Sequence, residues 1–194
     1  MDETQREALL KKIPTPLLNL GLLAYALTAD REWAAALLDE DENGSARRAY
    51  VRVMLAFVEG MTSAFKGFTL DQSDKKGVVL SPGQLALLRE EQYELQSGDA
   101  AVRQKLLPAA DNVLFAICML ARVVGEAPPT VTGDQGWQAF RRAIKVRNRV
   151  THPRLPHDLA VSDDDLVDVD KGIAWFEEQT GRLLQGVIPP KTTP

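Results

Sequence analysis

Apolar side chains recur at intervals of three and four residues along most of this chain, which is the spacing expected of amphipathic α-helices. The pattern is clearest between residues 45 and 66, where one face carries Val51, Met54, Leu55, Val58, Met61 and Phe65. The opposite face of the same segment carries Arg48, Arg52, Glu59, Ser63 and Lys66. Further helices are predicted over residues 16–38, 82–95, 102–124 and 136–152, and from Ser162 onward. We therefore expect an all-α fold, an up-and-down bundle of four to five main helices with an additional N-terminal helical segment.

Residues with known capping preferences mark three of the helix starts. Ser45 follows the turn at Asn43-Gly44 and is expected to cap the helix that comes after it. In the run "SPGQ" at residues 81–84, Ser81 is suited to cap a helix, Pro82 to occupy its first turn, and Gln84 to complete a capping box. Ser162 precedes three aspartates, whose carboxylates favour the positive end of a helix dipole. By contrast, "GFTLDQSDKKGVV" at residues 67–79 is expected to form a loop.

We expect the chain, residues 1–194, to form one domain. This length is sufficient for a single hydrophobic core, and no internal repeat or interdomain linker interrupts it. We interpret residues 1–44 as a helical addition to the basic bundle and residues 187–194, "VIPPKTTP", as a flexible tail. The apolar run at residues 16–29 is shorter than the roughly 20 residues that a bilayer span requires. The acidic character of the first residues also argues against a signal peptide, so we expect a packed helix and no membrane insertion.

Composition and charge then limit the classes of partner. The hydrophobic fraction of 45% and the charged fraction of 26% are those of an ordinary soluble protein. With a net charge of −4, the chain as a whole does not attract nucleic acid or an anionic membrane, so such a partner would need a local basic patch. Cys118 is the only cysteine, which excludes a disulfide framework within the chain and favours a cytoplasmic location.

One segment has a charge opposite to that of the rest of the chain. Residues 135–157 contain no carboxylate and six cations, which are Arg141, Arg142, Lys145, Arg147, Arg149 and Arg154. With six positive charges in this segment and −4 overall, the remainder carries −10. Such a segment is a candidate site for a phosphate-bearing partner. The alternative is a solvated basic face that is balanced by acidic neighbours.

The helical periodicity divides the side chains of this segment between two surfaces. Phe140, Ala143, Ile144, Val146 and Val150 form an apolar arc that is expected to face the core. Arg147 falls in the middle of that arc, so it needs an acidic partner, a route for its side chain to solvent, or an interface that covers it. Arg141, Asn148 and His152 fall on an adjoining polar stripe, and Lys145 lies just beyond them.

The end of this helix places a histidine where solvent and a substrate can reach it. Asn148 and His152 are four residues apart, so their side chains stack on one face of the helix. Pro153 disfavours helix at the residue before it, which puts His152 at the C-terminal end. An accessible imidazole beside arginines is suited to moving a proton during phosphate chemistry.

The stretch "VRNRVTHP", residues 146–153, resembles the motif of the HEPN superfamily (higher eukaryotes and prokaryotes nucleotide-binding). That motif is an arginine, a polar residue that is commonly asparagine, a few further residues, and a histidine, and it matches Arg147, Asn148 and His152 here. The motif covers six residues, and the order of helices extends the likeness over residues 45–185. The resemblance implies a helical bundle, usually dimeric, and in many members a metal-independent endoribonuclease that acts as a toxin or antiviral effector.

The resemblance also implies roles for individual residues. Two motif helices meet across a dimer axis in the family, so Arg147 would be covered by a second copy and would stabilise charge on the phosphate. His152 would transfer protons, and Asn148 would orient the histidine or a phosphate oxygen. The RNA backbone would be bound by Arg141, Lys145, Arg149 and Arg154. An antitoxin or regulatory protein is a further expected partner.

One departure from the family pattern affects the expected regulation. Some family toxins carry a tyrosine two residues after the histidine, to which an antitoxin transfers nucleotides. Arg154 stands at that position, so this form of regulation is not expected here.

Two alternatives to the nuclease interpretation belong to different functional classes. The chain could be a non-catalytic HEPN-like helical dimer that binds nucleotide, RNA or a protein partner through the same basic helix. A DNA-binding regulator is a weaker alternative, because no short helix-turn-helix pair is evident.

No metal site or cofactor is expected. His152 and His157 are the only histidines, and neither Cys-x-x-Cys nor His-Glu-x-x-His spacing occurs. No glycine-rich phosphate loop or dinucleotide fingerprint is present either.

Other polar and aromatic side chains have simpler interpretations. Glu59 is expected to form a surface ion pair with Arg52 or Lys66, and a role as an accessory catalytic carboxylate is a less favoured alternative. Trp137 and Trp175 are expected to anchor the core.

Overall fold

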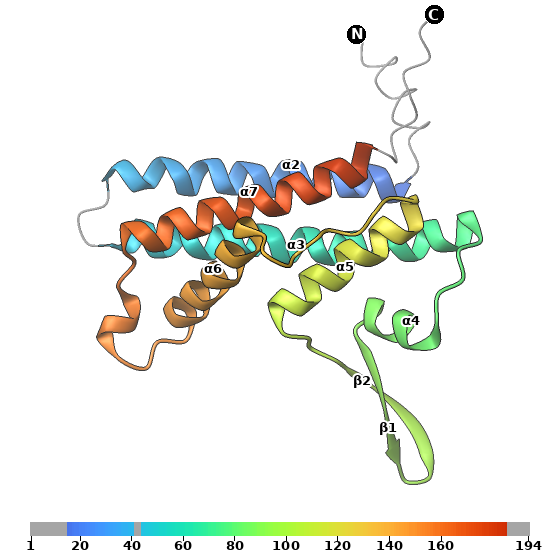
Figure 1. Ribbon diagram of the computed structural model, residues 1–194. Coiled ribbons are helices and arrows are strands. Elements are labelled where there is room, and N and C mark those ends of the chain that lie inside the picture. Colours follow the sequence, from blue (N-terminus) through green and yellow to red (C-terminus); the bar gives the residue numbers. More distant parts are fainter. Residues whose placement is uncertain (1–14, 41–43, 186–194) are drawn as a thin grey trace, which may run out of the picture.

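The computed structural model describes residues 15–40 and 44–185, and this part of the chain is mostly helical (Figure 1). Its elements, in order, are α2 (Thr15–Ala36), the 3₁₀ turn η1 (Leu37–Glu40), α3 (Ser45–Lys76), α4 (Pro82–Leu88), β1 (Glu91–Gln96), β2 (Asp99–Gln104), α5 (Ala109–Val124), α6 (Gln135–Thr151), η2 (Pro156–Leu159) and α7 (Asp163–Gln185). The predicted all-α fold class is confirmed, with one small hairpin added. The predicted tail at residues 187–194 and the first 14 residues of the N-terminal addition lie outside the described residues.

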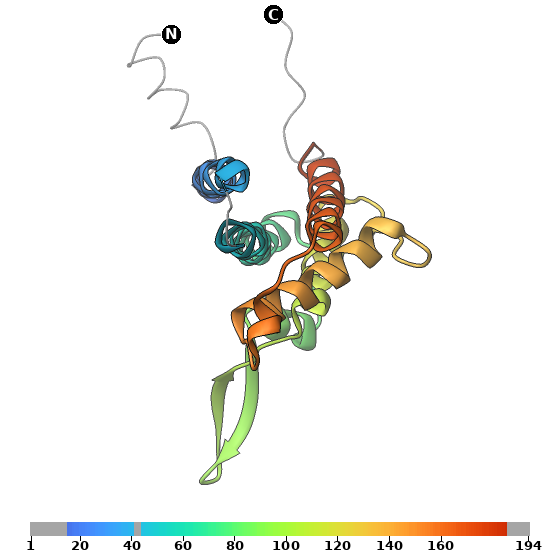
Figure 2. The same ribbon diagram turned by 90° about the vertical axis from the view of Figure 1, so that its left-hand side faces the viewer.

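Helix α3 is the central element of the bundle. It is 32 residues long and packs against α2, α5, α6 and α7. Figures 1 and 2 show α2 on one side of it, with α5 and α6 on the other. Thirteen of its residues are buried, on more than one face, because neighbouring helices cover it from several directions. Among the described residues, no helix combines the length and apolarity needed to cross a membrane.

The loop predicted for residues 67–79 is wrong over most of its length. Helix α3 continues to Lys76 and ends at Gly77, whose φ of 65° is a left-handed conformation that favours glycine. The added turns bury Phe68, Thr69 and Ser73, so they continue the core-facing side of the helix. Asp71 and Gln72 between these positions are half-buried, and Asp74, Lys75 and Lys76 after them are exposed, so the segment has the composition of a loop.

The boundaries predicted for the two helices on either side of residues 91–104 are also wrong, because this segment is an antiparallel hairpin. Helix α4 ends at Leu88 rather than near residue 95, and α5 begins at Ala109 rather than near residue 102. Ser97 and Gly98 have φ of 53° and 88°, the positive values that a two-residue hairpin turn of this kind requires. The hairpin projects away from the helices (Figures 1 and 2).

Two of the three predicted helix caps are confirmed, and the cap predicted at Ser45 is wrong, because Gly44 is the N-cap residue of α3 and Ser45 is already its first helical residue. The Ser81 hydroxyl accepts the backbone N–H of Gln84 at 3.2 Å, and the Gln84 side chain accepts the N–H of Ser81 at 2.9 Å. At the start of α7, the Ser162 hydroxyl accepts the N–H of Asp165 at 3.1 Å, and the Asp165 carboxylate accepts the N–H of Ser162 at 3.0 Å. These reciprocal bonds satisfy donors that a helix start leaves free.

An aromatic cluster joins α6 to α7 and confirms the two tryptophans as core anchors. The rings of Trp137 and Trp175 lie 4.9 Å apart, and those of Phe140 and Trp175 lie 5.6 Å apart. Gly172 of α7 lies so close to α6 that a β-carbon there would stand 2.7 Å from the α-carbon of Phe140. This close approach sets the position of α6 on the bundle.

We expect Gly172→Ala to destabilise the protein by about 1–3 kcal/mol, because the added methyl group meets backbone that cannot move without separating the two helices. Urea denaturation, monitored by circular dichroism, measures the change. Gly181→Ala is the matched control, since it lies in the same helix with no atom within 4 Å of its built β-carbon. That variant should gain roughly 0.5–1 kcal/mol from helix propensity. Equal stability of the two variants would contradict the proposed tight crossing.

Candidate nucleic-acid interface

Helix α6 has clear start and stop signals, and it matches the helix predicted for residues 136–152. The side chain of Asp134 accepts the backbone N–H of Trp137 at 2.7 Å and so caps the first turn. The last helical hydrogen bond runs from the N–H of His152 to the carbonyl oxygen of Asn148 at 3.0 Å. At His152 the backbone has left the helical conformation, with φ of −125°, directly before Pro153.

Arg147 has an acidic partner within its own chain. Its guanidinium donates from Nη2 to the carboxylate of Glu59 on α3 and from Nη1 to the side-chain oxygen of Asn148 at 3.1 Å. The Arg147 side chain is 24% exposed, so its end reaches solvent although the residue lies within the apolar arc. A guanidinium has five N–H donors, and two are used here, so the others can still bind a phosphate oxygen.

The partners predicted for Glu59 are therefore wrong. Lys66 is buried and instead binds Glu90, with 3.0 Å between Nζ and Oε1. Arg52 donates to the carbonyl oxygen of Val150 at 2.5 Å. Both side chains are engaged elsewhere, which leaves Glu59 facing Arg147 across the contact between α3 and α6.

Four side chains form a polar row along the outside of α6, which we call the α6 stripe: Arg141, Lys145, Asn148 and His152. Their spacing of four, three and four residues keeps them on one face, and all four are exposed. The row extends about 16 Å along the helix axis at 1.5 Å per residue. Within the described part of the chain, no ion pair involves Arg141 or Lys145, and no hydrogen bond involves the His152 imidazole.

Other cations of the segment are compensated by acidic side chains. Arg142 binds Asp168 through two nitrogens, at 2.7 and 2.6 Å. This bidentate contact holds the pKa of the Asp168 carboxyl below its usual range. Arg149, a predicted phosphate-binding residue, donates to Asp165 at 2.8 Å. Arg147 is paired with Glu59, so half of the six cations have an acidic partner. The alternative interpretation, a basic face balanced by acidic neighbours, predicts such pairing.

The loop after the motif is held by hydrogen bonds from its backbone N–H groups to the side chain of Asp158, whose carboxylate also lies 3.7 Å from Nε2 of His157. The carboxylate of Asp158 accepts the N–H groups of Leu155 at 2.9 Å and Arg154 at 2.8 Å. These two bonds lower the pKa of the Asp158 carboxyl, and the bond from Leu155 has the larger effect. The side chain of Arg154 is left exposed one residue beyond Pro153, close in sequence to the end of the α6 stripe.

Helix α3 contributes basic side chains that sequence reasoning did not assign to the site. The Arg52 guanidinium binds one of the last carbonyl groups of α6, where a cation is favoured by the helix dipole. Nearby, Arg47 and Arg48 reach carbonyl oxygens at residues 161 and 159, at 3.2 and 3.5 Å. The sequence did contain one indication that Arg52 belongs to this site, because Arg52 lies on the same polar face as Glu59, seven residues away. The polar face of α3 and the C-terminal end of α6 therefore form one surface.

Comparison of the chain with models of known families, with curated proteins and with solved structures finds no match. Among the described residues, no group of three or more His, Cys, Asp or Glu side chains lies close enough together to hold a metal ion.

Because Glu59 and Arg147 lie near the surface, their ion pair should contribute little to folding. We expect Glu59→Gln and Arg147→Gln each to lower the free energy of unfolding by about 1 kcal/mol or less. Urea denaturation of the two single variants and the double variant gives the coupling energy directly. A loss of about 3 kcal/mol or more in either single variant would instead show that the pair is a structural element of the core.

Proposed function

We propose that this protein is a metal-independent endoribonuclease whose active site includes Arg147, Asn148 and His152. The observation that carries the proposal is the α6 stripe, an exposed row of two cations and an amide that leads to an unbound imidazole. Arg147 lies beside this row, held by Glu59 and Asn148. The resemblance of these residues to the HEPN motif supports the same assignment.

RNA supplies its own nucleophile, so the protein has to move protons and stabilise negative charge. The 2′-oxygen attacks the phosphorus while the bond from phosphorus to the 5′-oxygen breaks. His152 accepts the proton of the 2′-hydroxyl, and the second copy's His152, in its protonated form, returns a proton to the departing 5′-oxygen. The products are a 2′,3′-cyclic phosphate and a 5′-hydroxyl.

In this proposal the remaining side chains bind and orient the RNA. Arg147 uses its free N–H donors to stabilise the charge that develops on the phosphate, while Glu59 and Asn148 keep the guanidinium in one orientation. Arg141 and Lys145 bind successive phosphates along the stripe, with Arg154 beyond its end, and Arg149 contributes through the N–H donors that Asp165 does not accept. A homodimer would bring two motif helices to one cleft. A cytoplasmic location, a toxin or antiviral role and an antitoxin partner belong to this proposal.

The decisive measurement is cleavage of RNA in excess EDTA by the parent protein and by His152→Ala. We expect the variant to lose at least about a hundredfold in rate, since it lacks the group that transfers protons. His157→Ala is the matched control, because it removes the other histidine, which is also exposed, and should leave the rate unchanged. Products of the parent should end in a 2′,3′-cyclic phosphate. Equal cleavage by His152→Ala and the parent would overturn the assignment.

A second candidate function is phosphate or RNA binding without cleavage. It is favoured by the ion pair between Arg147 and Glu59, because a neutralised guanidinium stabilises transition-state charge less well. Under this function His152→Ala would bind RNA as tightly as the parent, and neither protein would cut it.

Both functions predict that RNA binding depends on the unpaired cations of the α6 stripe. We expect Arg141→Ala to weaken binding and to reduce the slope of log affinity against log salt. On single-stranded RNA this reduction should be roughly 0.7 for each phosphate that the variant no longer neutralises. Fluorescence anisotropy over a range of salt concentrations measures both quantities. The adjacent Arg142→Ala changes the net charge equally but removes a residue that is bound to Asp168. If both variants weaken binding equally, overall charge rather than the stripe is responsible.

A further inference from the structure

Helix α2 has apolar side chains on the face that points away from the bundle. Its inner face packs on α3 through residues such as Leu20, Leu27 and Ala34. On the outer side a second row runs along the helix, which we call the α2 stripe: Leu18, Leu22, Tyr25, Ala29, Trp33 and Ala36. Leu22, Tyr25 and Trp33 are 59%, 79% and 59% exposed. A helix that is apolar all round is normally covered on all sides.

Helix α2 lies at an edge of the bundle, and none of the other described helices covers its outer row. Figure 2 shows α2 end-on with α3 directly beneath it, while α6 and the hairpin lie farther away on the other side of α3. Residues 15–29 contain no charged side chain, and the exposed polar side chains described for this half of α2 are those of Asn19 and Thr28. Tyrosine and tryptophan in such a row are typical of the centre of a protein interface.

We propose that the α2 stripe is a homodimer interface, in which it packs against the α2 stripe of a second copy with the two helices antiparallel. The order of side-chain sizes supports this partner, since the row is nearly self-complementary about residue 27. Leu18 then faces Ala36 of the second copy, and Tyr25 faces Ala29, so that in each pair a large side chain meets a small one. A contact between identical surfaces about a two-fold axis is the commonest arrangement in homo-oligomers.

The position of charge selects the antiparallel orientation. Asp30 and Glu32 flank the C-terminal half of the α2 stripe. The two residues lie on opposite sides of the row, so in a parallel pair Asp30 of one copy would face Glu32 of the other, and this contact of like charges is unfavourable. In the antiparallel pair the two copies of Asp30 stand about 9 Å apart along the axis and those of Glu32 about 15 Å, at 1.5 Å per residue. The acidic half then lies against the uncharged residues 15–29.

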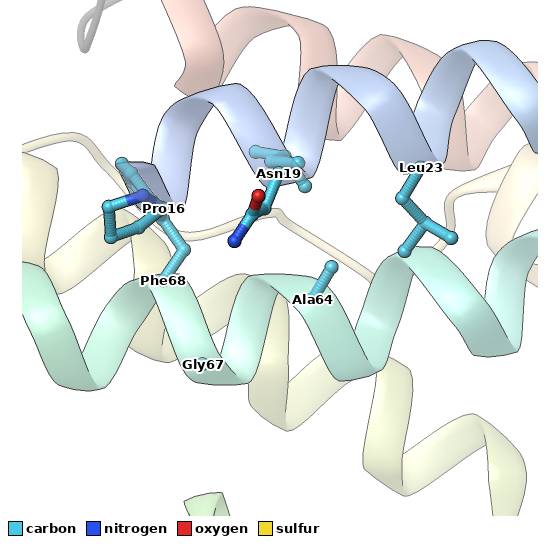
Figure 3. A pocket seen from close by; sticks show the side chains of 7 residues that line it. Pro16, Asn19, Leu23, Ala64, Gly67 and Phe68 are labelled. Atoms are coloured by element: carbon cyan, nitrogen blue, oxygen red, sulfur yellow. The ribbon is translucent and has the colours of Figure 1, made fainter. Parts of the chain in front are cut away.

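A groove beside α2 lies next to the place that the remaining large side chain, Trp33, would occupy in the antiparallel pair. It has a volume of about 290 Å³ and lies between α2 and α3, with Asn19 and Leu23 on one side and Ala64 and Gly67 on the other (Figure 3). Trp33 lies on the edge of the stripe that faces this groove. A two-fold axis keeps that edge on the same side in both copies, so the second copy's Trp33 meets Leu22 next to the groove.

This interface is separate from the contact through α6 that the nuclease proposal needs. Helices α2 and α6, which carry the two stripes, lie on different sides of α3 (Figure 2). Pairing through α2 does not by itself bring two copies of His152 together. A protein that uses both contacts would form a tetramer.

The first test is the molar mass in solution, by light scattering and sedimentation over a range of concentrations. We expect the parent to be dimeric or larger and Tyr25→Asp to have half its mass, while circular dichroism shows that the variant stays folded. Leu95→Asp is the control, because Leu95 is 89% exposed but lies on the hairpin, and its mass should equal that of the parent. A monomeric parent, or a Tyr25→Asp variant that associates like the parent, would overturn the proposal.

The second test reads the orientation of the helices, in a Cys118→Ser background that removes the native thiol. An equimolar mixture of Tyr25→Cys and Ala29→Cys should form a disulfide-linked heterodimer under mild oxidation, at least tenfold faster than either variant alone. An antiparallel pair brings residue 25 of one copy to residue 29 of the other, whereas a parallel pair brings residue 25 to itself. Efficient linkage of Tyr25→Cys alone would refute the antiparallel arrangement.

Discussion

The burial of one face of α6 against α3 and α7 determines which of its charges remain available to a ligand. Its apolar arc is enclosed by these helices, and Gly172 allows α7 to approach the backbone of Phe140 closely. With the helix held in that rotation, Arg142 and Arg149 meet aspartates of α7, and Arg147 meets Glu59 of α3. Arg141, Lys145 and His152 are left facing solvent. The candidate site is thus a consequence of helix packing rather than of total charge.

The ion pair of Arg147 has opposite consequences for the two proposed functions. A carboxylate beside the motif lowers the positive potential that would attract a phosphate. The same carboxylate, with Asn148, restricts a long side chain to one orientation, which favours transition-state stabilisation over simple binding. Breaking the pair is expected to cost little stability, so a substitution at Glu59 can change the charge around Arg147 while the protein stays folded.

Two surfaces of different chemistry therefore lie on different sides of α3. One is the polar α6 stripe, with its cations and histidine, and the other is the apolar α2 stripe with Tyr25 and Trp33. Their separation means that association of copies and recognition of a phosphate do not compete for the same area. Each surface is largely formed by a single helix, so each can be altered independently of the other.

The sequence by itself determined the helical class of the fold, the caps at Ser81 and Ser162, and the end of α6 at His152, because periodicity, capping and proline chemistry act over a few neighbouring residues. It did not determine the extension of α3 to Lys76, since those turns are stabilised by burial of Phe68 against distant parts of the chain. Only the tertiary structure decided that Glu59 binds Arg147 rather than Arg52 or Lys66. An ion pair between two helices depends on how they pack, and residues 88 positions apart carry no local signal of that contact.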